Sequence, residues 1–264
     1  MSATTGSPTV SVVIPTLDDT DALARSLPLV AAQSPFELVV VDNSSSPAPD
    51  PRLRELVARH GGRLVREPAP GVSAASFAGY DAARGEIIAR VDADTRVPAG
   101  WLDTVAARFA DGPGLHALTG PGTFYDVTGC RAGLLARTYR AALFWGLRGA
   151  MAGRPLWGSN MAIRASAWHA ISPLVERGDP ALHDDLEVAF RLGPLARVVY
   201  DPRLVVAVEA RAFHSRHALT GRVARTFTST WHAWSVLGPG GRWVCRLSRG
   251  RWVSRPDLFP VGRA

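Results

Sequence analysis

Apolar runs alternate with amphipathic segments along the first 125 residues of the chain. The run at 10–14 contains Val, Ile and one Ser and stops at Pro15, which is typical of a strand buried on both faces of a sheet. Capping residues and helix breakers delimit the segments between such runs. The elements expected here are strands at 10–14, 37–41, 63–66 and 86–91 and helices at 19–33, 51–60, 73–84 and 101–110.

This alternation predicts an α/β fold with a mostly parallel, Rossmann-like sheet flanked by helices. Ligands of such sheets bind beyond the carboxyl ends of the strands. Polar loops follow three of the expected strands, at residues 16–19, 42–46 and 92–95. Because these strand ends share one edge of a parallel sheet, we expect the three loops to converge on a single site.

The rest of the chain has a less regular pattern. The elements expected there are strands at 117–126, 161–164, 198–200 and 204–208 and helices at 131–150, 165–171, 184–192 and 220–234. Beyond the Gly- and Pro-rich residues 238–241 we expect an irregular segment. The domains expected are a disordered N-terminus (1–9), a main domain (10–210) with a nucleotide-binding half (10–115) and an acceptor half (116–210), and a C-terminal helix with an Arg/Trp-rich tail (211–264).

Positive charge is concentrated towards the C-terminus. The chain of 264 residues has a formal net charge of +7, yet residues 206–264 alone hold ten arginines and only two acidic residues. A nucleic-acid-binding protein would need a basic face on its main domain, so the near-neutral residues 1–205 argue against nucleic acid as a partner. Since tryptophans accompany these arginines, we expect residues 238–264 to contact anionic lipid headgroups.

The sequence contains no uncharged stretch long enough to span a membrane, and its first residues lack the apolar core of a signal peptide. Its two cysteines fit neither a disulfide framework nor a metal-binding spacing. We therefore expect a cytoplasmic protein, held peripherally at the inner face of the membrane where the tail binds lipid.

Two aspartates, Asp92 and Asp94, follow the strand expected at 86–91. Side chains at i and i+2 of an extended segment point to one side, where two carboxylates repel unless a cation lies between them. A hard divalent ion, Mg²⁺ or Mn²⁺, suits carboxylates beside a diphosphate. The alternative is a turn with two solvated aspartates; the position at a strand's carboxyl end, beside two other polar loops, favours the metal.

A second acidic group opens the helix expected at 184–192. Asp184, Asp185 and Glu187 lie in its first turn, where carboxylates also stabilise a helix through its dipole. Near a metal site, a carboxylate in this position is a candidate general base that removes a proton from an attacking hydroxyl.

A small polar patch, Gly158–Asn160, lies between apolar residues. It is either a simple turn or a surface on which a polyhydroxylated ligand lies, with Asn160 supplying both a donor and an acceptor. The glycine-containing segment 71–76 lacks the three-glycine dinucleotide fingerprint, and the absence of lysine excludes a P-loop.

Seven segments occur in a characteristic order along residues 10–205. They are VSVVIPTLDD (10–19), LVVVDNS (38–44), GVSAA (71–75), GEIIARVDAD (85–94), GSNMAIR (158–164), DDLEVAFRL (184–192) and VYDP (199–202). This series resembles family 2 of the inverting glycosyltransferases, which have the nucleotide-diphospho-sugar (GT-A) fold. The resemblance implies transfer of a sugar from a nucleotide-diphosphate donor to an acceptor hydroxyl, and a role in cell envelope glycan biosynthesis.

The resemblance also implies roles for individual residues. Asp185 is the implied catalytic base, and Asp184 stands beside it in place of the family's usual glutamate. The implied donor-binding residues are Pro15, Thr16, Asp18, Asp42, Arg90, Asp92, Ala93 and Asp94. The implied acceptor-binding residues are Trp157, Gly158, Asn160 and Glu187. The divalent cation, Mn²⁺ or Mg²⁺, is implied at Asp94 and Asp92, with His214 or His217 as a further candidate ligand.

The chain departs from the family pattern in three places. Leu17 stands where an aromatic residue often packs on the base, and Ser76 and Phe77 replace a common Arg-Asn pair. Arg90 is a candidate replacement for the phosphate contact that this pair would supply. The Gln-x-x-Arg-Trp signature of processive members is missing, so we expect one sugar to be added to a saccharide, lipid-linked or small-molecule acceptor.

Two other functions are compatible with a similar fold. A nucleotidyltransferase typically has a glycine-rich, basic phosphate loop after its first strand, whereas the loop at 15–19 is acidic and has no glycine. A catalytically silent binding protein is the second. The intact Asp92, Asp94 and Asp185 argue against it, and the missing Arg-Asn pair argues for it.

Overall fold

The computed structural model describes residues 6–44, 46, 48, 50–127, 134, 138, 141–211, 215–249 and 260–261. A seven-stranded sheet of order β3-β2-β1-β4-β7-β5-β8 forms its centre, and β6 and β9 form a second, two-stranded sheet. Strand β7 runs antiparallel to both of its neighbours, and the other pairings are parallel. The strands are β1 (Val10–Thr16), β2 (Glu37–Asp42), β3 (Arg63–Arg66), β4 (Ile87–Arg90), β5 (Ala117–Thr119), β6 (Gly122–Phe124), β7 (Met161–Arg164), β8 (Val198–Tyr200) and β9 (Val206–Val208).

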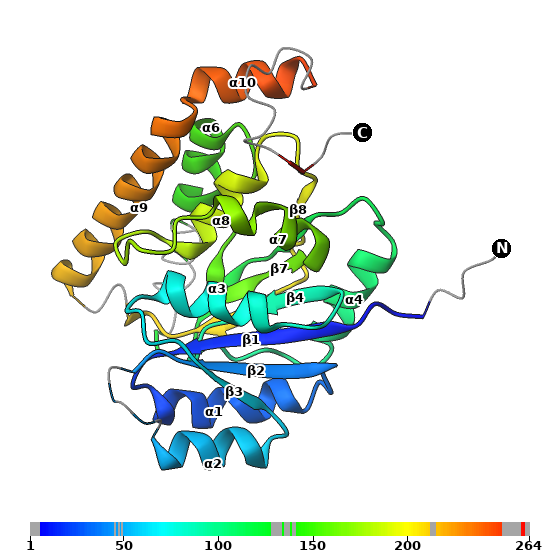
Figure 1. Cartoon of the computed structure of the whole chain (residues 1–264), viewed down its shortest axis with the longest axis vertical. Helices are drawn as coiled ribbons and strands as arrows, with labels where there is room; N and C mark the ends of the chain where they lie inside the picture. Colours follow the sequence, from blue (N-terminus) through cyan, green and yellow to red (C-terminus); the bar gives the residue numbers. More distant parts are fainter. Residues whose placement is uncertain are drawn as a thin grey trace.

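Helices cover both faces of the large sheet (Figure 1). Helices α1, α2 and α4 pack on one face, and α3, α7 and α8 pack on the other, with α9 and α10 outside this second layer. The helices are α1 (Thr20–Ala31), α2 (Pro51–Arg59), α3 (Val72–Ala82), α4 (Trp101–Ala110), α6 (Leu147–Met151), α7 (Ala165–Ile171), α8 (Asp184–Leu192), α9 (Arg216–Val236) and α10 (Pro239–Leu247), with short turns η1 (Ala142–Gly146), η2 (Gly158–Asn160) and η3 (Ser172–Leu174). Of the helices in the described part of the chain, none combines the length and apolar character that a membrane crossing requires.

Alternate residues of the uniformly apolar strands supply the two halves of the core. Val12 and Ile14 of β1 belong to the core beneath α1, whereas Val13 belongs to the core beneath α3. Burial of each such side chain contributes about 1.5–3 kcal/mol. Helix α3 approaches closely because it carries Gly79, where a Cβ atom would collide with the side chains of Val13 and Val41. The predicted mostly parallel α/β sheet flanked by helices is confirmed.

The structure corrects two of the expected strands. The strand expected at 117–126 is two strands, β5 and β6, because Gly120 and Pro121 interrupt the pairing. The strand expected to reach Val91 ends at Arg90, and the following residues form a turn closed by the Thr95 N–H and the Asp92 carbonyl at 3.0 Å. Most of the helix expected at 131–150 and the first five residues of the N-terminus lie outside the described residues; the described part of that helix includes η1 and α6.

The prediction of an irregular segment beyond residues 238–241 is wrong for residues 242–247, which belong to helix α10 (Pro239–Leu247). Pro239 occupies the first turn of this helix, where its missing N–H is harmless. The guanidinium of Arg242 is buried and donates to the Phe190 carbonyl at 3.1 Å. Arg246 donates to the carbonyls of Ala152 and Pro194. Part of the basic C-terminal charge therefore fastens α10 to the rest of the protein.

Candidate active site

The carboxyl ends of β1, β2 and β4 meet at one rim of the sheet, as the order of polar loops predicted. Two cavities open there, and Thr16 lines both of them. The first, here called the Asp94 cavity, has a volume of 310 Å³ and is lined by Pro15, Thr16, Leu17, Asp19, Asp92, Ala93, Asp94, Phe124, Trp157, Ser159, Val208, Glu209, Arg211 and Arg222. The second, the Asp42 cavity, has a volume of 570 Å³ and includes Asp18, Asp42 and Ser44 in its lining.

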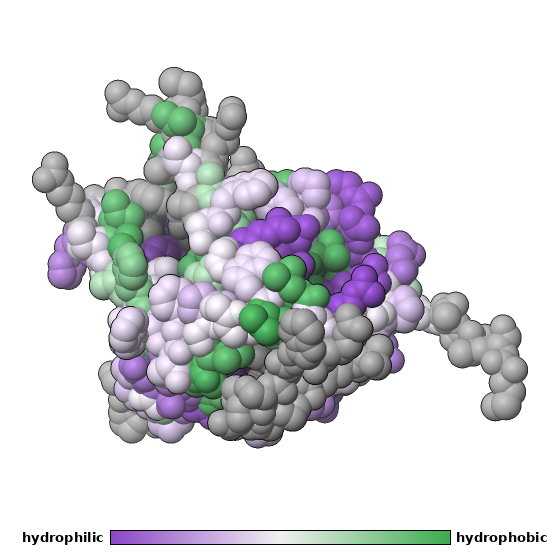
Figure 2. Space-filling model, turned by 90° about the horizontal axis from the view of Figure 1, so that it is seen from above, coloured by the Kyte–Doolittle hydropathy of each residue, from purple (hydrophilic) through white to green (hydrophobic). Residues whose placement is uncertain are grey.

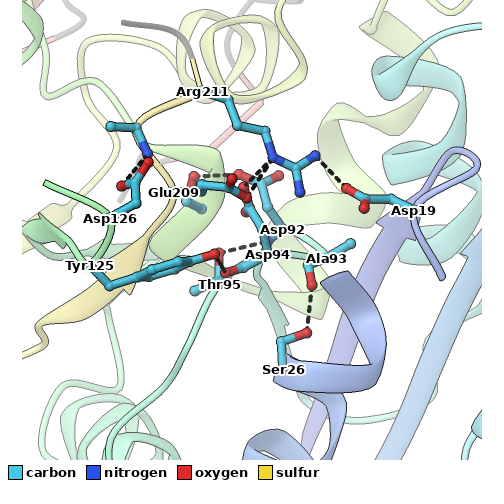
Figure 3. Close-up of polar contacts among 12 residues, drawn as sticks. Asp19, Ser26, Asp92, Ala93, Asp94, Thr95, Tyr125, Asp126, Glu209 and Arg211 are labelled. Atoms are coloured by element: carbon cyan, nitrogen blue, oxygen red, sulfur yellow. Dashed lines mark hydrogen bonds and ion pairs between the residues drawn. The ribbon is translucent and has the colours of Figure 1, made fainter. Parts of the chain in front are cut away.

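Four carboxylates border the Asp94 cavity, and one guanidinium pairs with three of them. Arg211, which directly follows the segment 209–210 after β9, lies between Asp19, Asp94 and Glu209 (Figure 3). Its Nε is 2.8 Å from Glu209 and 3.6 Å from Asp94. The Tyr125 hydroxyl, from the end of β6, donates to the Asp94 carbonyl at 3.4 Å. The two small-sheet strands thus close the cavity over the Asp92–Asp94 turn.

The chemistry of these side chains suits a hard divalent cation. Burial, together with the neighbouring Asp92 carboxylate, raises the pKa of Asp94 to about 7. A divalent ion bound there would offset this repulsion through oxygen ligands, which Mg²⁺ and Mn²⁺ prefer. Within the described residues, no three acidic, His or Cys side chains are grouped closely enough to hold an ion by themselves. Asp92 and Asp94 supply two carboxylates at the Asp94 cavity, and oxygens of a bound ligand would have to supply further ligands to an ion there.

Arg90 connects the two acidic motifs. It is 3% exposed, and its guanidinium lies 2.8 Å from the Asp92 carboxylate and 3.3 Å from the Asp184 carboxylate. Burial alone would lower the pKa of Arg90, but these two carboxylates raise it above its usual value. Burial also raises the pKa of Asp184, against the opposing effect of Arg90. Arg90 does not line either cavity, so the structure places it beneath the site as a link between β4 and α8.

The turn η2 makes a second connection between the same motifs. The Gly158 N–H donates to the Asp185 carboxylate at 2.8 Å, and the Ser159 hydroxyl donates to the Asp92 carboxylate. Gly158 also leaves room for Arg90, because a Cβ atom at this position would collide with the guanidinium. Asp92 and Asp185, far apart in sequence, are thus held in a fixed relation by two consecutive residues of one turn.

Asp185 faces a third, larger space. Together with α9 and α6 it lines a groove of 1020 Å³, here called the α9 groove. The second carboxylate oxygen of Asp185 accepts a hydrogen bond from the Leu186 N–H at 2.7 Å. The carboxylate is therefore oriented by two backbone donors while one side remains at the groove. A carboxylate fixed in this way at the edge of a ligand-sized groove can accept a proton from a bound hydroxyl.

The structure does not bring all predicted residues to a cavity. Asn160 is fully buried, and its side chain accepts from Trp101 Nε1 and donates to the carbonyls of Pro121 and Leu204. Glu187 is also fully buried and pairs with Arg191 at 2.7 Å. These two side chains stabilise the scaffold beside the site, where the acceptor was expected to touch them.

The remaining predicted residues fall into three groups. Asp42 lines its cavity while it accepts the Ser44 N–H at 2.9 Å and lies 3.3 Å from Arg66. His217, near the start of α9, is exposed and lines neither cavity, whereas His214 lies outside the described residues. Pro15, Thr16, Asp18, Ala93 and Trp157 line one or both of the cavities.

Sequence reasoning missed Asp19, Glu209 and Arg211 as members of this site. Glu209 and Arg211 follow β9, a strand that the sequence did predict. The rule that ligands bind beyond strand ends, applied to β9 as it was to β1 and β4, would have indicated both residues.

Comparison with known proteins shows the family and the fold. A family model described as glycosyl transferase family 2 matches residues 11–166. An uncharacterized glycosyltransferase of Mycobacterium tuberculosis is 35% identical over 141 residues, which are 53% of this chain and 59% of that protein. The chain thus spans less than two thirds of the length of this curated relative.

Two solved structures illustrate the shared fold. A mannosyltransferase from Pyrobaculum calidifontis, in complex with GDP-Man and Mn²⁺, has a TM-score of 0.62 at 21% identity, with 97% of this chain and 73% of that chain covered. A glucosyl-3-phosphoglycerate synthase from Mycobacterium tuberculosis, in complex with Mn²⁺ and UDP-Glc, has a TM-score of 0.57 at 19% identity, with 85% and 78% covered. At these identities the likeness shows the fold.

Proposed function

Because the chain belongs to glycosyl transferase family 2 and has the GT-A fold, we propose that it transfers one sugar from a nucleotide-diphosphate donor to an acceptor, with inversion at the anomeric carbon. The observation that carries this proposal is η2, which joins Asp92 at the Asp94 cavity to Asp185 at the α9 groove. A donor site and a candidate base are thereby held on either side of one turn.

The nucleotide would bind across the two cavities at the strand ends. The Asp42 cavity has room for the nucleoside, and its Thr16 hydroxyl is buried without a hydrogen-bond partner among the described residues. A buried orphan hydroxyl of this kind gains from a ligand that hydrogen-bonds to it. The diphosphate would then lie in the Asp94 cavity, next to Asp94 and Arg211.

A divalent cation fits the same cavity, with Asp94 and Asp92 as the side chains that would hold it. The similar mannosyltransferase and glucosyl-3-phosphoglycerate synthase were both solved with Mn²⁺ and a nucleotide sugar. When bound, the ion would supply charge neutralisation for the leaving nucleotide diphosphate. Arg211 pairs with Asp94 in this structure and would contact the diphosphate once Asp94 turns to the ion.

Asp185 would act as the base. Its carboxylate accepts the proton of the acceptor O–H as the acceptor oxygen forms a bond to the anomeric carbon. The bond from that carbon to the diphosphate oxygen breaks, and the electron pair leaves with the nucleotide diphosphate. The Gly158 and Leu186 N–H groups orient the carboxylate, and the Arg90–Asp184 pair positions the helix end that carries it.

We also propose a cytoplasmic enzyme of cell envelope glycan synthesis that contacts the membrane peripherally and is not processive. Membrane contact is supported by the exposed apolar surface of α10, where Val244 and Leu247 are 45% and 76% exposed. Apolar side chains among basic ones are typical of helices that lie in a membrane interface.

The test is a panel of nucleotide sugars and acceptors with Mn²⁺ or Mg²⁺. We expect at least one nucleoside diphosphate to raise the melting temperature when the metal is present. Asp94→Asn should abolish this rise, whereas Asp103→Asn, on α4 away from the cavities, should preserve it. Binding without transfer to any acceptor would indicate a silent binding protein, and absence of both would overturn the proposal.

A further inference from the structure

The α9 groove differs in character from the cavities at the strand ends. Its lining residues come mainly from α9, α8 and α6, and its volume is 1020 Å³. These helices lie near one another at the same end of the molecule (Figure 1). Its lining includes the apolar side chains of Leu147, Leu186, Leu219, Val223, Phe227, Trp231 and Trp234. Seen from above, apolar side chains reach the surface at this end of the molecule among pale and polar ones (Figure 2).

One wall of the groove is an apolar stripe on α9. Leu219, Val223, Phe227 and Trp231 follow one another at intervals of four residues, which places them on one helix face. They are 41%, 47%, 72% and 74% exposed, and all four line the groove. A contiguous apolar surface of this kind on a solvent-exposed helix face is typical of a binding site for an apolar partner.

The threonine hydroxyls and one indole N–H along the groove already have hydrogen-bond acceptors within the protein. The hydroxyls of Thr226, Thr228 and Thr230 donate to carbonyls of their own helix, at 2.8–3.1 Å. Trp234 Nε1 donates to the Ala150 carbonyl at 3.1 Å. A sugar chain needs many donors and acceptors from its site, and these groups are already engaged. Their methyl groups and rings leave a lining suited to hydrocarbon.

The groove adjoins the proposed reaction site at one end. Asp185, the proposed base, is part of its lining, and Arg222 lines both the groove and the Asp94 cavity. A molecule in the groove therefore has its polar end at Asp185 and close to the donor.

We propose that the α9 groove binds the apolar chain of the acceptor, so that the acceptor is an amphiphile whose reacting oxygen is carried on a long hydrocarbon chain. The part of this proposal that concerns the reacting oxygen at Asp185 rests on the proposed function. The acceptor O–H loses its proton to Asp185 and forms the glycosidic bond, and the chain along α9 holds that oxygen in place. Arg222, which lines both spaces, carries a positive charge at this junction, so alkyl phosphates are the suitable probe.

Binding of alkyl phosphates tests the groove without donor or metal. We expect Kd to fall about threefold per added methylene from butyl to octyl to dodecyl phosphate, below their micelle concentrations. Thr226→Trp, which fills the groove, should make Kd nearly independent of chain length. Ala224→Trp, exposed on α9 and outside the lining, is the matched control and should keep the wild-type dependence. The matching alkanols separate a phosphate-bearing acceptor from a neutral alcohol.

A second variant covers the case in which Thr226→Trp fails to fold. Phe227→Ser changes a largely exposed side chain and should raise the Kd of dodecyl phosphate about tenfold, with butyl phosphate unaffected. A Kd that does not depend on chain length in the wild type would overturn the proposal. So would self-association in sedimentation that Trp231→Ser abolishes while chain length has no effect, because the stripe would then be an interface between two copies.

The outcome is separable from that of the proposed function. Chain-length dependence without nucleotide binding would leave the groove assigned and the transferase proposal wrong. Nucleotide-dependent transfer to a short, polar acceptor, without chain-length dependence, would confirm the enzyme and overturn the groove assignment.

Discussion

The Asp94 cavity and the α9 groove lie on opposite sides of one turn, and their polar groups are satisfied in different ways. In the Asp94 cavity, ion pairs join residues of distant elements, such as Arg211 after β9 to Asp19 before α1. In the α9 groove, the threonine hydroxyls bond within their own helix and the apolar side chains remain exposed. The first region is organised for a charged ligand, whereas the second has an apolar surface that is exposed to solvent.

The two regions should also respond differently to substitution of their side chains. Charges beneath the Asp94 cavity, such as the buried pair of Arg90 and Asp184, depend on one another, so removal of one leaves its partner unpaired. The groove depends on area and shape, so each substitution there removes a modest increment. Variants should therefore separate the two regions cleanly.

The largest effect is expected for Arg90→Met. It leaves the Asp92 and Asp184 carboxylates without their buried cation, so the free energy of unfolding should fall by about 3–5 kcal/mol in chemical denaturation. Arg52→Met breaks an exposed pair with Asp21 and should cost at most about 1 kcal/mol. Asp184→Asn added to Arg90→Met should restore part of the loss. Equal losses for Arg90→Met and Arg52→Met would contradict the role of Arg90 as a link.

Gly158→Ala tests the turn between the two regions. The new methyl group collides with the Arg90 guanidinium and should lower the free energy of unfolding by about 1–3 kcal/mol. Transfer should drop at the same time, because Asp92 and Asp185 lose their fixed relation. Gly149→Ala is the control, since a Cβ atom there meets nothing within 4 Å. A Gly158→Ala protein as active and stable as Gly149→Ala would refute the connection.

Asp201→Asn provides a reference outside both regions. Hydrogen bonds from Arg203 and Arg108 hold the pKa of the buried Asp201 carboxyl well below its usual value. A carboxyl whose pKa is depressed by folding adds stability that is complete above its unfolded-state pKa. This stability is lost as the pH falls from there through the folded-state pKa. The variant should thus lose about 2 kcal/mol at neutral pH, and the difference should shrink below about pH 4. Chemical denaturation of the wild type and of Asp201→Asn, from neutral pH to below about pH 4, measures this difference in stability. A difference independent of pH would be inconsistent with an ionised Asp201.

The smallest effect on stability is expected for Leu247→Ser on α10. This side chain is 76% exposed, so the free energy of unfolding should change by less than about 0.5 kcal/mol. Binding to anionic vesicles should nevertheless weaken if α10 contacts the membrane as proposed. Leu29→Ser, a partly exposed position on α1, is the control and should bind vesicles like the wild type. Unchanged binding by Leu247→Ser would count against membrane contact through α10.

The sequence predicted the parts of the fold that local patterns determine. Strands β1 and β2 contain mostly apolar runs that stop at Pro15 and Asp42, and both strands were expected within two residues of their observed ends. Asp92 and Asp94 were expected at a strand end, where paired carboxylates can bind a cation. Asp185 was expected at a helix start, where a carboxylate can act as a base. In each case residue type and position along one element were sufficient.

The rest depends on contacts between distant residues. Arg211 reaches Asp19 across 192 positions in the sequence, and no local pattern reports such a pair. Arg90 was expected to touch phosphate, but packing of α8 against β4 buries it between Asp92 and Asp184. Residue type alone does not distinguish a buried guanidinium from one that faces a ligand.

Separation of donor binding from turnover by two single substitutions tests the central claim most directly. In Asp94→Asn, a nucleoside diphosphate with Mn²⁺ should no longer raise the melting temperature. In Asp185→Asn, the rise should persist while transfer falls by about 10²–10⁴-fold. Transfer that survives in Asp185→Asn, or stabilisation that survives in Asp94→Asn, would contradict a site in which Asp94 serves the donor and Asp185 serves the acceptor.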